Sequence, residues 1–147
     1  MTATINEPDV NVWRDAMIDF ALETDISDES DYARIGMALH DCRIRDSLMW
    51  YAIEDNASTL YRVAMSAAQH VPEKMRAPAL CLGSVCAATL GNEQLAVACA
   101  NWAYIADPSS HMAVLLILTA KDPGLVDGVP LVIGSLTYEE CRYGSDG

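Results

Sequence analysis

The chain has 147 residues, of which 52% are hydrophobic and 20% are charged, and its formal net charge is −12. This size and composition are typical of one packed globular domain and exclude wholesale disorder. Residues 1–60 hold 13 acidic and four basic residues, and so negative a field disfavours direct binding to nucleic acid or to a membrane surface.

Apolar residues at helical spacing predict an all-α fold of about seven helices stacked as antiparallel hairpins. Asp28, Asn92 and Asp107 are expected to cap three of them, and Gly91 is expected to end the fifth. We expect residues 1–11 to be a poorly ordered arm, 12–121 the helical domain and 122–147 an irregular tail, with a frayed strand over 131–133 left open. The expected helices cover residues 12–24, 29–40, 42–54, 58–71, 78–90, 93–106 and 108–121.

Small residues in the fifth and sixth helices predict a close contact between them. They are Gly83, Ala87, Ala96, Ala100 and Ala103. The core face of the sixth helix is expected to consist of Leu95, Cys99, Trp102 and Ala106. The segment 78–116 resembles one tetratricopeptide-type hairpin, with small residues in the expected places and Pro108 closing the second helix. Leu80 and Ala87 stand where that pattern has large aromatic side chains.

A wider resemblance covers residues 12–120. The elements Arg45–Leu48, Ala77–Leu80, Leu90–Asn92 and Ala106–Pro108 follow one another, with Ala96 between the last two. In this order they resemble the C-terminal helical half of the actinobacterial domain of unknown function 4192 family. The resemblance implies a helical fold and no established activity. Long members carry an additional N-terminal α/β half, and a free-standing helical half suits a compact genome such as that of a phage.

Nothing in the sequence indicates a leader or a transmembrane span. The five cysteines are an odd number without a CxxC spacing, which favours reduced thiols and a cytoplasmic location. Cys81, Cys86 and Cys99 are expected to be core residues, and Cys141 to be the most accessible thiol.

Enzyme function has little support. His40, His70 and His111 lack metal-ligand spacing, and a phosphate-binding glycine loop and a nucleophile elbow are both missing. No Lys or Arg lies between Ala77 and Ala120 to activate a thiol. We therefore expect no catalytic residue, no metal and no cofactor.

The third helix suggests a contact site for a protein partner. Ile44, Leu48 and Tyr51 form its core stripe, which leaves a second apolar edge of Met49, Trp50 and Ile53. An exposed edge of this composition is typical of binding hot spots. The alternative is a central helix that is buried on both sides.

The sequence thus favours a non-enzymatic protein-interaction module, with self-association left open. The alternative is an acidic inhibitor that mimics nucleic acid and binds a basic DNA-binding protein. Its contact residues would be Asp25, Asp28, Glu29 and Asp31. The two differ in salt dependence, because attraction between exposed charges is screened by salt.

Overall fold

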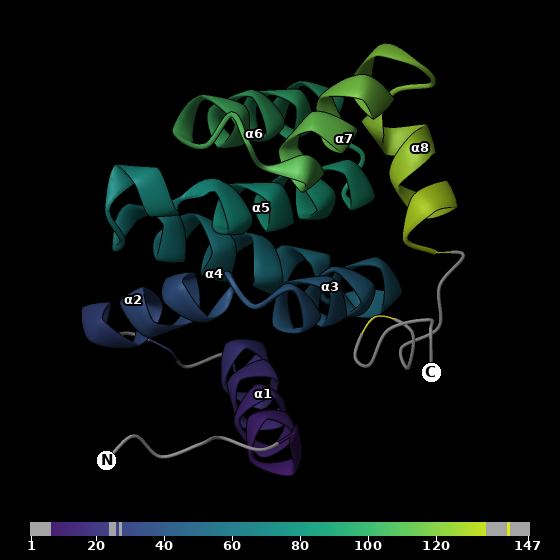
Figure 1. The fold of residues 1–147 in the computed structure, drawn as a ribbon. Coiled ribbons are helices and arrows are strands. Elements are labelled where there is room, and N and C mark those ends of the chain that lie inside the picture. Colours follow the sequence, from purple (N-terminus) through teal and green to yellow (C-terminus); the bar gives the residue numbers. More distant parts are fainter. Residues whose placement is uncertain (1–6, 24–25, 27, 135–140, 142–147) are drawn as a thin grey trace.

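The structure is a computed structural model that describes residues 7–23, 26, 28–134 and 141, and this part of the chain is helical without a strand. The all-α prediction is confirmed (Figure 1). The elements are α1 (Glu7–Leu22), α2 (Glu29–Ala38), α3 (Cys42–Tyr51), η1 (Ala52–Asn56), α4 (Ala57–Gln69), η2 (Glu73–Met75), α5 (Ala77–Thr89), α6 (Glu93–Ala106), α7 (His111–Lys121) and α8 (Leu125–Val132).

Side-chain caps begin several of these helices. Asp28 accepts a hydrogen bond from the Ser30 amide, and Asn92 accepts one from the Leu95 amide, as the sequence predicts. Helix α7 begins three residues later than expected, because Ser110 is its cap and Asp107 holds the preceding turn through Ser109. Gly91 ends α5 with a φ of 83°, which only glycine adopts easily.

Helices α3 and α4 are joined by the π-helical turn η1. The sequence predicts a break between them at about residues 55–57, and the backbone angles agree: they are helical at Ala52 and depart from helical values at Asn56. Asn56, with φ −121° and ψ 17°, marks the change of direction, and its side-chain amide donates to the Tyr51 carbonyl. An inserted residue in a helix of this kind is a π-bulge.

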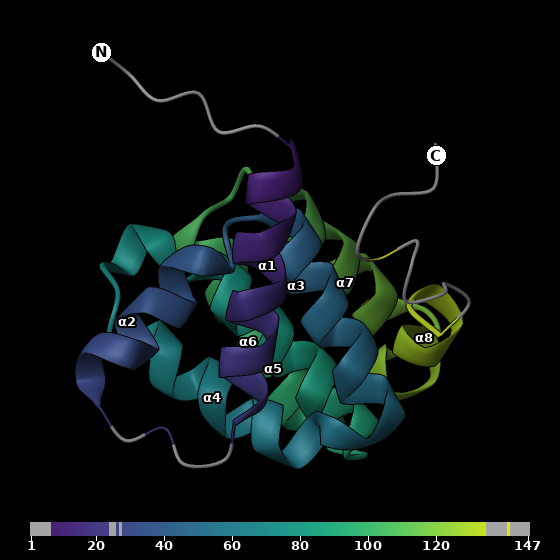
Figure 2. The same cartoon turned by 90° about the horizontal axis from the view of Figure 1, so that it is seen from below.

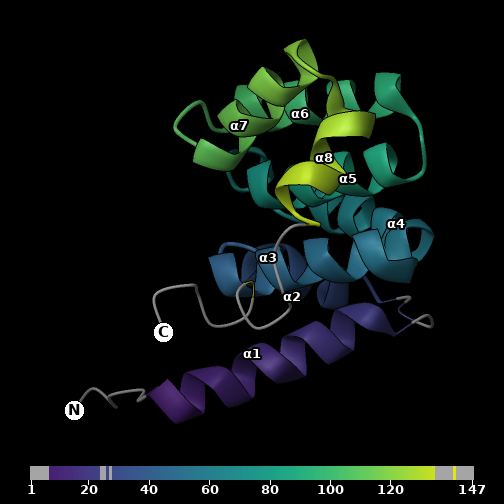
Figure 3. The ribbon, with the colours of Figure 1, turned by 90° about the vertical axis from the view of Figure 1, so that its right-hand side faces the viewer.

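The helices form a layered stack. In Figure 1, α1 lies at one end, α2 and α3 follow, and α6 and α7 lie at the opposite end. The side view in Figure 3 shows the same order, with α8 beside α5. The acidic N-terminal helices and the α6–α7 hairpin are therefore at opposite ends of the molecule.

Helix α5 is the centre of the core. Each of its residues from Ala79 to Ala88 is buried, and it contacts α3, α4, α6, α7 and α8 (Figure 2). The Ser84 hydroxyl donates to the Ala96 carbonyl at 2.8 Å, which ties α5 to α6. All five small residues predicted for this contact are buried. The tetratricopeptide-like stacking of the hairpins stays a prediction.

Both ends of the predicted domain need correction. Residues 7–11, expected in a poorly ordered arm, belong to α1, and residues 125–132, expected in an irregular tail, form α8. The tail forms a helix because Leu125, Val129 and Ile133 are buried at a spacing of four, which is a helical stripe. Residues 1–6 of the predicted arm lie outside the described residues. So do residues 135–140 and 142–147 of the predicted tail.

Candidate functional site

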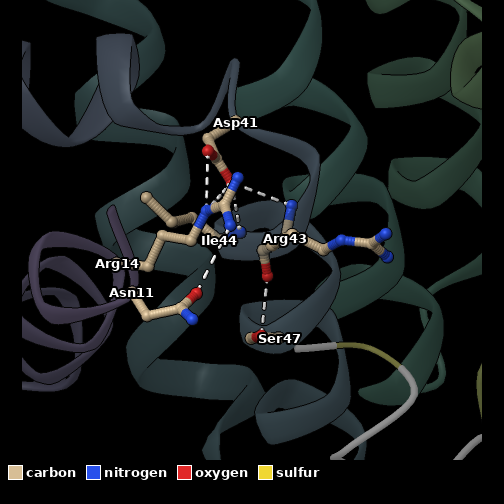
Figure 4. Close-up of polar contacts among 6 residues, drawn as sticks. All are labelled: Asn11, Arg14, Asp41, Arg43, Ile44 and Ser47. Carbon is tan, nitrogen blue, oxygen red and sulfur yellow. Dashed lines mark hydrogen bonds and ion pairs between the residues drawn. The ribbon is translucent and has the colours of Figure 1, made fainter. Parts of the chain in front are cut away.

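A cluster of polar contacts fixes α1 against the start of α3 (Figure 4). The Asp41 carboxylate caps α3 by accepting from the amides of Arg43 and Ile44, and Arg14 Nε donates to its two oxygens at 3.1 and 2.9 Å. The Asn11 side chain accepts from Arg14 Nη1. These groups hold one another in place, so the cluster joins two helices and offers little to a ligand.

The predicted contact edge of the third helix is mostly internal. Met49 is 1% exposed, so its place in an exposed edge is wrong. Trp50 and Ile53 are half-buried, with Ile53 against the core and Trp50 edge-on to Tyr51 at 5.1 Å between ring centroids. The alternative of a helix buried on both sides describes α3 better, because α1 and α5 cover it from two directions.

The acidic cluster lies at the start of α2. Asp28 and Glu29 are exposed and Asp31 is half-buried, whereas Asp25 lies outside the described residues. Hydrogen bonds from the amide and hydroxyl of Ser30 lower the pKa of Asp28. Carboxylates in this position stabilise the positive end of the helix dipole, a structural role that leaves their outer faces accessible to solvent.

Three buried thiols, those of Cys81, Cys86 and Cys99, are poor nucleophiles. Burial raises the pKa of Cys81 and of Cys86 to about 12 and that of Cys99 to about 11, whereas catalytic cysteines have lowered values. The expected accessibility of Cys141 is wrong, since the residue is 2% exposed. Cys42 is the exposed thiol.

A polar pocket of about 380 Å³ lies where α3, α5 and α7 begin or approach one another. His40 bonds to the Met75 carbonyl at 2.9 Å, and Arg45 donates twice to Asp46. Asp107 accepts from Ser109, and these bonds lower its pKa. His40, Arg45 and Asp107 are thus engaged within the chain. The part of the chain that the structure describes contains no cluster of three metal-binding side chains.

A second hollow has the character of a protein-binding groove. It has a volume of about 330 Å³ and lies between α4, η2 and α6. Trp102 and Ile105 stand on its α6 side and are 51% and 69% exposed. The remaining lining residues are Met65, Ala68, Gln69, Glu73, Arg76, Leu80 and Ala106.

The groove combines an apolar floor with a polar rim. Ala68 and Leu80 are buried beneath it, while Gln69 and Glu73 are exposed at its edge. The Arg76 side chain is half-buried at the rim and donates through Nε to the Val71 carbonyl at 3.3 Å. Tryptophan and arginine around an apolar hollow are the residue types that most often dominate binding energy.

Sequence reasoning misplaced Trp102. Spacing alone assigns it to the core face of α6, but the buried face consists of Ala96, Cys99, Ala100 and Ala103. These short side chains let α6 lie close to α5, and the indole is left outside. A run of alanines at helical spacing beside a tryptophan was the available signal, because the smallest side chains mark the closest helix contact.

Comparison with known proteins gives one match. The model of a family described as a domain of unknown function (DUF4192) matches residues 2–125. No curated protein and no solved structure matches the chain. No helix in residues 7–23 or 28–134 is long and apolar enough to cross a membrane.

Proposed function

The chain belongs to the DUF4192 family, a family without an assigned function, and we propose that it is a non-enzymatic protein-interaction module that binds its partner in the Trp102 groove. The observation that carries the proposal is the exposed indole beside an apolar hollow. Exposing the apolar surface of an indole to water is unfavourable in free energy. Exposed apolar hollows commonly mark binding sites.

The groove suits a peptide segment with one large apolar side chain. The hollow of about 330 Å³ is at the lower end of the range for small-molecule sites. Its floor of Ala68, Leu80 and Ala106 offers no charge to pair with, so an aliphatic or aromatic anchor fits best. Glu73 and Arg76 at the rim can bond to the backbone or polar groups beside that anchor.

Other features support binding over catalysis. The buried cysteines have raised pKa values, and His40 and Arg45 of the polar pocket form hydrogen bonds within the chain. If the gene is of phage or actinobacterial origin, as the resemblance suggests, the partner would be a host or cellular protein, encountered in the cytoplasm.

The test is a peptide selection with a matched control. Random displayed peptides are selected on the wild-type protein in about 0.5 M NaCl, which screens exposed charges, and affinities are then measured by titration calorimetry. Trp102→Ala should weaken binding by about 2 kcal/mol or more, because it removes the anchor of the groove. Trp13→Ala is the control, since Trp13 is 46% exposed on α1, away from the groove.

Two results would contradict the proposal. One is equal binding by the wild type and by Trp102→Ala, when that variant keeps the wild-type melting temperature. The other is a selection that yields binders only in low salt, whose binding is lost on neutralising Asp25, Asp28, Glu29 and Asp31 together. That outcome would favour the acidic inhibitor, for which the exposure of Asp28 and Glu29 is the supporting observation.

A further inference from the structure

The outer face of the α6–α7 hairpin is apolar and lacks a covering layer in the described part of the chain. We define this α6–α7 face by four exposed, uncharged residues that do not line the groove: Tyr104, Val114 and Leu118, with Asn101 at its polar edge. Leu118 is 57% exposed and Tyr104 is 43% exposed. The opposite sides of both helices carry the buried residues, including Ala103 and Leu116.

The face is also almost without charge. Between Ala77 and Ala120 the sequence has two carboxylates, Glu93 and Asp107, and no Lys or Arg. Both carboxylates lie at the ends of α6 and are engaged: Glu93 accepts from the Leu125 and Val126 amides, and Asp107 accepts from Ser109. Lys121 stands at the last position of α7. A charged partner therefore finds little to attract it here.

The position of the face favours a second copy of this chain. Two copies with a charge of −12 each repel one another. Figures 1 and 3 place α1 and α2 at one end of the stack and α6 and α7 at the other. Contact through the α6–α7 faces keeps the acidic helices of the two copies as far apart as the fold allows. A two-fold interface brings the same patch of both copies together, and an uncharged patch then meets no like charge.

From the uncharged apolar surface and its place opposite the acidic end, we propose that the α6–α7 face is the interface of a two-fold symmetric homodimer. In it, the hairpins of two copies pack as four helices. At 1.5 Å per residue, α6 is about 21 Å long. Two helices of this length, side by side at a spacing of about 10 Å, offer a small interface. The dimer is accordingly expected to be weak and concentration-dependent.

Sedimentation equilibrium tests the proposal, at protein concentrations up to about 0.5 mM, a range that detects dissociation constants in the micromolar range. A reducing agent is present throughout, because the exposed Cys42 thiol could link copies covalently. Leu118→Glu should weaken the dimer at least about tenfold by placing like charges opposite one another. Leu118→Lys should weaken the dimer as well, although it makes the chain less acidic. Weakening by both variants would show that the cause is a charge in the interface and not a higher net negative charge.

The controls separate this interface from the groove and from general acidity. Val12→Glu adds the same charge at a site 69% exposed on α1 and should leave dimerisation unchanged. Trp102→Ala removes the groove residue and should also leave it unchanged. Raising NaCl from about 0.05 to 0.5 M should strengthen the wild-type dimer, since salt screens the repulsion between copies.

The proposal is overturned by a wild-type chain that stays monomeric over the whole concentration range in high salt. It is equally overturned by a dimer that Leu118→Glu and Leu118→Lys leave unchanged while both variants keep the wild-type circular dichroism spectrum. A dimer that dissociates in high salt would point to contact through charged helices instead.

Discussion

Gly36 and Gly83 are both buried in helices, yet their surroundings differ. A methyl group at Gly36 would lie 2.6 Å from Val71 Cγ1 and 3.0 Å from the Ala67 carbonyl oxygen. At Gly83 it would lie 3.1 Å from Met65 Sδ. The first neighbour set includes backbone, which cannot move without shifting α4, whereas the methionine side chain can rotate away.

We predict that Gly36→Ala destabilises the protein by about 1–3 kcal/mol, because the added methyl overpacks the contact between α2 and α4. Gly83→Ala should cost less than about 1 kcal/mol, since the gain in helix propensity offsets part of a smaller clash. Urea unfolding followed by circular dichroism measures both. Equal losses of unfolding free energy in the two variants would contradict the prediction that the helix contact is tighter at Gly36 than at Gly83.

Single residues also mark the limit of sequence reasoning. Asp28 and Asn92 were predictable caps, because their roles depend on neighbours within three positions. Met49 and Trp102 were not, because their exposure depends on which helices lie against α3 and α6. Periodicity gives the direction in which a side chain points from its own helix. Whether another helix packs against that side depends on residues far away in the sequence.

At the scale of elements, α8 is held at its first turn by a residue of α6. The Glu93 carboxylate accepts hydrogen bonds from the Val126 amide at 2.8 Å and the Leu125 amide at 2.9 Å. These amides have no partner within α8, as in any first turn of a helix. Gly124, with a φ of 107°, turns the chain toward the carboxylate.

We predict that Glu93→Ala lowers the stability of the protein by about 1–2 kcal/mol, the usual cost of losing a helix cap. Protection of α8 amides against hydrogen exchange should fall more than that of α5, since α8 loses its anchor and α5 keeps its surroundings. Glu93→Gln is the conservative control and should lose less, because its amide oxygen still accepts a bond. Unchanged exchange in α8 would refute the role of Glu93.

This contact explains why the tail was mispredicted. Asp122, Pro123 and Gly124 predict a turn correctly. Asp127 and Gly128 also predict a turn, but they lie in a helix that depends on a carboxylate more than 30 residues earlier. Helices α2, α5 and α6 were predictable, because Asp28, Gly91 and Asn92 signal a start or a stop beside them. The groove was not, since it forms only where α4 and α6 approach each other.

Over the whole molecule, three buried thiols link stability to pH. The pKa values of Cys81 and Cys86 are raised to about 12 and that of Cys99 to about 11, against an ordinary value of 9.0. The unfolded chain therefore loses these protons at lower pH than the folded chain. Stability is fully present below about pH 9 and falls as the pH rises toward the folded values.

We predict that the free energy of unfolding falls between pH 9 and 11, with a limiting slope of about 1.4 kcal/mol per pH unit for each thiol. Urea titrations at several pH values under reducing conditions measure it. Cys86→Ala should show a shallower slope, whatever its effect on stability at neutral pH. A pH-independent free energy of unfolding over this range would contradict the burial of these thiols.

The enclosure of α5 has a consequence for how the molecule unfolds. In an extended helical repeat each hairpin contacts only its neighbours, so terminal hairpins can open one at a time. Here α5 contacts α3, α4, α6, α7 and α8. Loss of the α6–α7 hairpin or of α4 would expose the same apolar helix to water. Partial opening is therefore nearly as unfavourable as complete unfolding, which makes the transition cooperative.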